Sequence, residues 1–214
     1  MWAECWADVN GKRITPHMHL RLEQRCGAGG FADVFRISDT EVVKLFRRVQ
    51  IVEAAIEEPQ DHETVIRAVW DAECSAHEIA EFRSDLARHL VPYHGRVIVT
   101  DVLDSGGQSR GAEYVLDCGV RLALITGFEE KAGNLEGHTL FPIIDAYLDA
   151  LNDAGIKAPW DSSVFIPGVG TEFTIIDVGT WEAFAVLSAA LADSGRLPDT
   201  ARKQWSKPFG NSAV

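Results

Sequence analysis

Alternating apolar and polar positions predict a run of short strands near the start of the chain. The segments 19–26, 32–37 and 41–46 each have strand character. The second and third segments are separated by the turn formers Ser38, Asp39 and Thr40. We therefore expect an antiparallel meander, with a glycine-rich connection between its first two strands.

The periodicity changes after residue 61. Between His62 and Leu90, apolar side chains recur every three or four residues, at Val65, Val69, Ala76, Ile79, Phe82 and Leu86. This spacing predicts one long helix. Strand character returns in the segments 96–103, 112–120 and 121–128, with the turn-rich sequence DSGGQSRG between the first two.

The last third of the chain reads as mostly helical. In TLFPIIDAYLDALNDAG, residues 139–155, the apolar side chains form one stripe, and Gly155 is placed to end the helix. The sequences SSVFI and EFTIID predict a strand pair, and WEAFAVLSAALADSG predicts a further helix. We expect an α+β fold of two lobes, a β-rich lobe over 1–128 and a small helical lobe over 129–214.

Composition and charge exclude several classes of protein. Of the 214 residues, 46% are hydrophobic and 24% charged, which is typical of a folded globular protein. A formal charge of −12 argues against nucleic-acid and anionic-membrane partners. Without a long apolar run or a signal-peptide core near Met1, we expect a cytoplasmic location, with export by another route left open.

Cysteine and histidine spacing gives no metal signature. Cys5, Cys26, Cys74 and Cys118 are scattered without a CxxC pattern, so we interpret them as reduced thiols. His17 and His19 stand close together but lack partner ligands in the sequence, and loop or strand positions explain them more simply.

The stretch CGAGGFADVF, residues 26–35, is the first candidate for chemistry. Three glycines within four residues weaken a strand, because glycine adds backbone entropy to the unfolded chain and no packing side chain to the fold. Such a loop can bring backbone N–H groups against phosphate oxygens, and it can also simply close a hairpin.

Together with the element order, this stretch resembles the glycine loop of protein kinases, G-x-G-x-[FY]-G-x-V. The match runs from Gly27 to Val34 and departs only at the third glycine, which is Ala32. The resemblance implies ATP as ligand. It implies that the nucleotide is covered by Gly27, Ala28, Gly29, Gly30 and Phe31, with Val34 against the base.

Lys44 in VVKLF matches the lysine of the kinase V-A-I-K pattern. A lysine between apolar neighbours must direct its ammonium to solvent or to a buried partner. The resemblance implies that it contacts the nucleotide phosphates and a glutamate of the following helix. We choose Glu78 for that glutamate, with Glu81 in reserve; a solvated helix face is the alternative for either.

Asp177-Val178-Gly179 follows a predicted strand and resembles the kinase D-F-G motif, with valine in place of phenylalanine. A carboxylate at a strand end suits Mg²⁺, or Mn²⁺, bridging nucleotide phosphates. An Asx-type turn is the alternative interpretation of Asp-x-Gly.

The catalytic loop matches least well. Kinases have H-R-D-x-x-x-x-N before the strand that precedes D-F-G, whereas this chain has GIKAPWDSSVFI. In register with that strand, Ala158 occupies the position of the catalytic aspartate, and Ser163 that of the metal-binding asparagine. Asp161 could supply the missing carboxylate from a shortened loop, with Ser163 as a weak metal ligand.

These features resemble the minimal kinases among bacterial secreted effectors, in particular small type III effectors that phosphorylate the heat-shock-90 chaperone of the host. Only 35 residues follow Gly179, and no A-P-E motif is present. The resemblance implies a Ser/Thr-type protein kinase that acts on a host protein such as a chaperone, in the host cytosol. The alternatives are a nucleotide-binding pseudokinase or adaptor, and a kinase-fold enzyme that transfers AMP.

Overall fold

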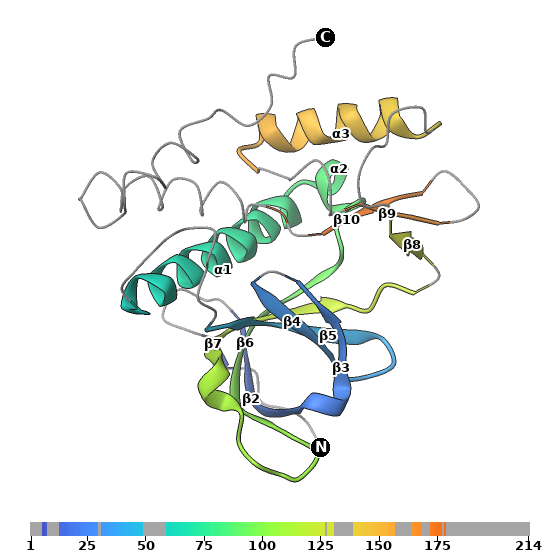
Figure 1. Cartoon of the computed structure of the whole chain (residues 1–214). Coiled ribbons are helices and arrows are strands. Elements are labelled where there is room, and N and C mark those ends of the chain that lie inside the picture. The colour runs from blue at the N-terminus through green and yellow to red at the C-terminus, as the bar shows by residue number, and fades with distance from the viewer. Residues whose placement is uncertain are drawn as a thin grey trace, which may run out of the picture.

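The computed structural model describes residues 6–7, 13–29, 31–48, 59–126, 128–130, 139–156, 164–167, 172–176 and 178. Its first half contains the strands β1 (Trp6–Ala7), β2 (Arg13–Arg21), β3 (Arg25–Ala28), β4 (Ala32–Arg36) and β5 (Glu41–Arg47) and the helices α1 (Pro59–Glu81) and α2 (Ser84–Ala87). Its second half contains β6 (Tyr93–Leu103), β7 (Tyr114–Ala123), β8 (Phe128–Glu130), α3 (Phe141–Asp153), β9 (Val164–Pro167) and β10 (Thr174–Ile175). The fold is mixed α+β, as the sequence predicts (Figure 1).

The larger sheet has the strand order β1-β2-β6-β7-β5-β4-β3. Its pairs are antiparallel except for β2 and β6, which run parallel. The meander expected from the glycine-rich region is present as β3, β4 and β5, in consecutive order at one edge. A smaller antiparallel sheet joins β8, β9 and β10, and it includes the strand pair predicted from SSVFI and EFTIID.

Several predicted boundaries are wrong. The segment expected as one strand over 19–26 is divided by a 3₁₀ turn at Leu22–Gln24, so its two parts belong to β2 and β3. The two strands expected over 112–120 and 121–128 are largely one strand, β7. Periodicity alone could not locate these points, because an alternating pattern continues across a tight turn and across an uninterrupted strand alike.

The helix expected from His62 to Leu90 is also divided. It ends at Glu81, and Arg83 has an extended backbone before the short α2 begins. Ile79 and Phe82, expected on its buried stripe, are 45% and 90% exposed. The true stripe follows Val65, Val69 and Ala76 and then continues through Ala80.

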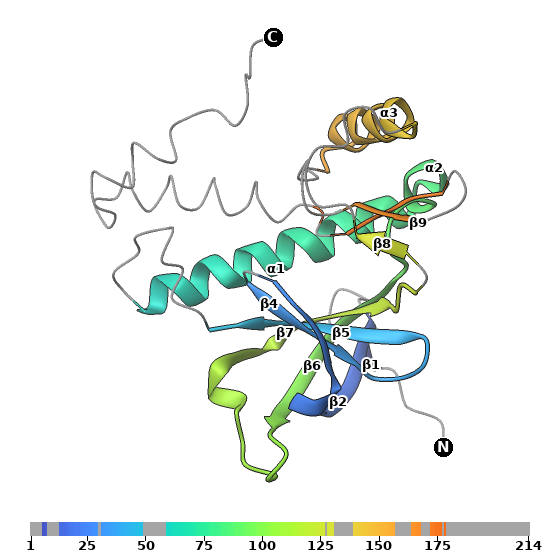
Figure 2. The same cartoon turned by 45° about the vertical axis from the view of Figure 1, so that its right-hand side comes forward.

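Helix α1 lies between the larger sheet and α3 (Figures 1 and 2). Residues of α1 pack against the sheet in one cluster, with Val65, Ile66 and Val69 facing Val42, Phe46, Val120 and Leu122. The opposite face of the sheet is covered by a second cluster, which includes Leu20 of β2 with Phe35, Val43, Leu45 and Tyr114. The sheet is therefore buried on both faces, and this fixes its side-chain register.

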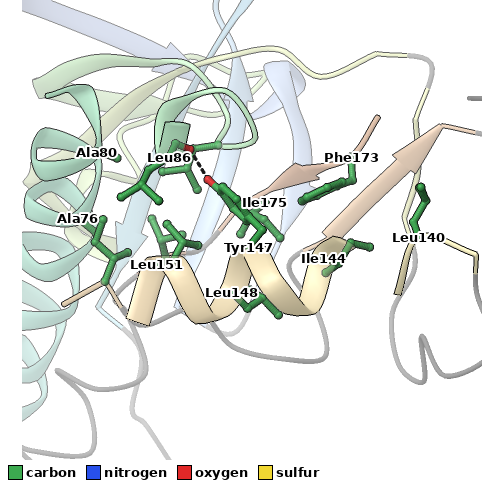
Figure 3. Packing of buried hydrophobic residues seen from close by; sticks show 13 residues of the cluster. Ala76, Ala80, Leu86, Leu140, Ile144, Tyr147, Leu148, Leu151, Phe173 and Ile175 are labelled. Atoms are coloured by element: carbon green, nitrogen blue, oxygen red, sulfur yellow. Dashed lines mark hydrogen bonds between the residues drawn. The ribbon is translucent and has the colours of Figure 1, made fainter. Parts of the chain in front are cut away.

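A third cluster joins α3 to the C-terminal half of α1, to α2 and to β10 (Figure 3). Ile144, Leu148 and Leu151 form the buried stripe predicted for α3. The Tyr147 hydroxyl donates a hydrogen bond to the Leu86 carbonyl, which links α3 to α2. Gly155 has φ of +80°, so the prediction that it ends this helix is confirmed.

No helix in the described part of the chain is long and apolar enough to cross a membrane. The predicted helix over 181–195 lies outside the described residues.

Candidate functional site

One row of residues crosses four strands on the face of the larger sheet that packs against α1. Gly27 of β3 pairs with Val34, Val34 pairs with Lys44, and Lys44 pairs with Val120 of β7. Val34 and Val120 both pack in the cluster beneath α1. Paired residues in neighbouring strands project to the same face. The row therefore places Lys44 beside Val34, two strands from the glycine-containing strand.

Lys44 forms an ion pair with Glu73 of α1. Its Nζ donates to both carboxylate oxygens of Glu73, at 3.0 Å from Oε1 and 2.8 Å from Oε2. The Glu73 side chain is 1% exposed, and that of Lys44 is 12% exposed. The ammonium also lies 5.4 Å from the centre of the Phe46 ring. A buried pair of opposite charges in direct contact is costly to break, so it fixes α1 against β5.

The glutamate that the structure places against Lys44 is Glu73, whereas Glu78 was the choice from the sequence. Glu78 instead accepts from Arg96 Nε of β6 at 3.0 Å and from the Tyr93 hydroxyl at 3.2 Å. The reserve candidate, Glu81, is exposed at the end of α1. Arg96 pairs with Val120, so it continues the same row beyond Lys44.

Helical spacing contained a signal for Glu73. It lies four residues after Val69 and three before Ala76, on the buried stripe of α1. An acidic residue on an apolar stripe needs a buried partner, and a lysine on an apolar strand needs one too. The offset of five residues between Glu73 and Glu78 is about one and a half turns of helix. The number of residues between the helix and a later motif does not distinguish two glutamates that lie so close together.

The strands β3 and β4 form a hairpin, the glycine hairpin, whose glycines are not required by the fold at the two described positions. A Cβ at Gly27 would lie 3.5 Å from Val34 Cβ, and one at Gly29 would lie 3.7 Å from the Ala32 carbonyl oxygen, both ordinary contacts. Neither residue has a positive φ. Closing the hairpin therefore does not explain why these positions lack a side chain. Close approach of a ligand would explain it.

The hairpin closes through a hydrogen bond from Gly29 N to the Ala32 carbonyl, at 2.8 Å. Ala28 is exposed, and Phe31 is half-buried against the cluster beneath α1. Gly30 lies outside the described residues.

An apolar wall lies around Lys44 on the α1 face. Val34, Val42, Leu122 and Leu124 belong to or pack against one cluster. Val42 and Leu122 are buried in it, whereas the half-buried Val34 and Leu124 offer contacts to a flat aromatic ligand, because such sites are mostly apolar with a few charged groups. The Lys44 ammonium supplies the positive charge that a phosphate would require.

Three predicted site residues, Asp161, Ser163 and Asp177, lie outside the described residues. The segment before Asp177 is held firmly. Ile175 N donates to the His89 carbonyl at 2.7 Å, and Val91 N donates to the Ile175 carbonyl at 3.1 Å. Ile176 packs against the same cluster as Val34 and Phe46.

The described residues contain no group of three His, Cys, Asp or Glu side chains that could hold a metal ion. Burial raises the pKa of the Cys74 and Cys118 thiols to about 12. Both therefore stay protonated at neutral pH, which leaves them poor nucleophiles and poor metal ligands. Cys26, Cys74 and Cys118 are free, as the sequence predicts, and Cys5 lies outside the described residues.

No protein-family model matches this chain, and no curated protein matches it.

Proposed function

We propose that this chain is a minimal protein kinase, which transfers the γ-phosphate of ATP to a protein hydroxyl. The observation that carries the proposal is the buried pair between Lys44 on β5 and Glu73 on α1. Protein kinases require a lysine of the third strand to be paired with a glutamate of the following helix. Here Lys44 lies on the third strand counted from β3, and α1 is the next helix.

The glycine hairpin supports the same proposal independently. Gly27 and Gly29 leave open backbone where a side chain would fit, two strands from Lys44. In the proposed complex, this backbone covers the phosphates, and Lys44 contacts the α- and β-phosphates. Val34 packs against the base, together with Leu124, which is also half-buried against this cluster.

The remaining roles fall on residues assigned from the sequence. Asp177 would bind Mg²⁺ or Mn²⁺, which neutralises phosphate charge, and Ser163 would add a weaker metal contact. Asp161 would orient the attacking hydroxyl and accept its proton. In the transfer step the bond between the γ-phosphorus and the bridging oxygen breaks, a bond to the substrate oxygen forms, and ADP leaves.

We propose that the substrate is a host protein such as a chaperone, as the resemblance to effector kinases implies. The chain's charge of −12 favours neutral or basic segments over acidic ones around the acceptor hydroxyl. Ala158 at the position of the catalytic aspartate favours a second candidate, a pseudokinase that binds nucleotide without transfer.

The test compares ATP labelled at the γ-phosphate with ATP labelled at the α-phosphate. The purified chain is incubated with Mg²⁺ and each nucleotide, alone and with a eukaryotic lysate, and protein-bound label is measured. The same assays are run on Asp161→Ala, Asp177→Ala and Glu73→Gln. Asp153→Ala, at the exposed end of α3, is the matched control for loss of an aspartate.

We expect γ-label on protein with the natural chain and with Asp153→Ala, and strong loss of label with the three site variants. Label from the α-phosphate would identify AMP transfer instead. A thermal shift with Mg·ATP but no label from either nucleotide would favour the pseudokinase. The absence of both a thermal shift and a label would overturn the nucleotide site itself.

A further inference from the structure

A second charged group, around Asp33, lies on the face of the glycine hairpin away from Lys44. Asp33 of β4 is 1% exposed and accepts a hydrogen bond from the Tyr114 hydroxyl at 2.8 Å. Arg25 Nη1 lies 3.5 Å from the same carboxylate, and Arg47 Nε lies 3.7 Å from its other oxygen.

Arg47 also holds the tip of the hairpin. Its Nη2 donates to the Gly29 carbonyl, and its backbone N donates to the Phe31 carbonyl at 2.8 Å. One residue at the end of β5 thus contacts two peptides of the hairpin, three positions after Lys44. Asp33 faces the guanidinium from the adjacent strand.

We infer that Arg47 is a positioning residue for nucleotide binding, and that Asp33 holds its guanidinium in place. This inference rests on the proposed function. The two hydrogen bonds hold the Gly29 and Phe31 carbonyls against the end of β5. The hairpin tip therefore keeps one position relative to Lys44, which lies three residues earlier on the same strand.

The physical need for such a residue follows from the glycines. A glycine-rich tip has more backbone freedom than any other sequence, and ordering each residue costs about 1–2 kcal/mol. A contact that orders the tip before the ligand arrives improves affinity without touching the ligand. Burial and the Asp33 carboxylate raise the pKa of Tyr114, so its hydroxyl stays protonated and remains a donor to Asp33.

Arg47→Ala tests the inference, with Arg36→Ala as the matched control. Arg36 lies at the far end of β4 and pairs with the exposed Asp39 at 2.9 Å. Because Arg47→Ala leaves Asp33 buried with less compensation, the double variant Asp33→Asn/Arg47→Ala is measured beside it. The readouts are Mg·ATP affinity by calorimetry and hydrogen exchange of the amides in residues 27–32.

We expect both Arg47 variants to bind Mg·ATP about tenfold more weakly, which is about 1.4 kcal/mol. We also expect faster exchange at the hairpin tip, while Arg36→Ala matches the natural chain in both readouts. If the natural chain binds Mg·ATP and the folded Arg47 variants bind it equally well, the inference is wrong and the proposed function stands. If the natural chain does not bind Mg·ATP, the proposed function fails and the inference fails with it.

Discussion

Glu73 on α1 and Lys44 on β5 are in direct contact, with Lys44 Nζ 2.8 Å from Glu73 Oε2, although 29 residues separate them in the sequence. The pair joins the sheet that contains the glycine hairpin to the helix that covers this sheet. Because the carboxylate is almost fully buried, its charge acts on Lys44 with little screening by solvent. The position of the ammonium therefore depends on the position of α1.

Glu73→Gln should reduce phosphoryl transfer more than tenfold, because the amide lacks the charge that orients Lys44. We also expect a loss of about 1–3 kcal/mol in the free energy of unfolding. Glu78→Gln is the control, since Arg96 keeps its contact with Asp71 at 2.6 Å. Transfer assays and urea unfolding check both variants. Equal losses of transfer in the two variants would contradict the assignment of Glu73.

The glycine hairpin gives a prediction in which binding and stability change in opposite directions. Gly27→Ala should leave the fold intact or stabilise it by about 0.4–1 kcal/mol, because alanine reduces the freedom of the unfolded chain. The same methyl group would occupy the space proposed for a phosphate. Affinity for Mg·ATP should therefore fall about tenfold, measured by calorimetry beside a thermal melt.

Gly119→Ala on β7 is the variant to compare with Gly27→Ala. A Cβ there would lie 2.6 Å from Val97 Cγ1 and 2.7 Å from the Val97 carbonyl oxygen, so backbone must move. We expect a clear loss of stability for this variant and none for Gly27→Ala. Comparable destabilisation by both would mean that Gly27 is needed for packing, which would remove one support of the nucleotide site.

The sequence predicted local features of this fold better than relations between distant segments. The two strands after the glycines, the stripe of α3 and the role of Gly155 each depend on a few neighbouring residues, and all are present. The partner of Lys44 depends on how α1 is rotated and shifted over β5. That relation is set by packing between elements, so the helical stripe marks Glu73 as a buried position but does not identify Lys44 as its partner.

The charged group around Asp33 was missed for a related reason. Asp33 stands between the apolar residues Ala32 and Val34 on a short strand, and an aspartate there looks like a solvent-facing position in the sequence. Its burial depends on Tyr114, 81 residues further along the chain. Only the pairing of β5 with β7 brings that tyrosine near the hairpin.

The packing of α3 predicts a large contrast between two adjacent residues. Ile144 is fully buried in the cluster that joins α3 to α1, whereas Ile143 is 49% exposed. Ile144→Ala should cost about 2–5 kcal/mol, through lost burial and the cavity left behind. Ile143→Ala should change stability by no more than about 0.5 kcal/mol. Urea unfolding measures both, and a similar cost for each would contradict the described orientation of α3.

The protonation of His89 should affect the stability of the fold, because this side chain contacts Phe173 in the segment before Asp177. Its ring stacks on Phe173 at 4.0 Å between centroids, and its Nδ1 lies 3.2 Å from the Phe173 carbonyl oxygen. Arg88 Nε donates to its Nε2 at 2.8 Å, so the neutral ring donates from Nδ1. Burial, with a smaller contribution from the Arg88 charge, lowers the pKa of His89 below its usual value of 6.5, although Phe173 and Glu172 oppose this.

A lowered pKa means that the unfolded chain binds the proton more tightly than the folded chain does. The contribution of His89 to stability is therefore fully present above about pH 6.5 and is lost as the pH falls through the folded pKa. Relative to the natural chain, His89→Phe keeps a ring to stack on Phe173 and removes the titrating group. The difference in urea midpoint between the two proteins should change between pH 7.5 and pH 5, with the natural chain losing more. Parallel pH profiles would show that His89 titrates alike in the folded and unfolded chains, since all other histidines are common to both proteins.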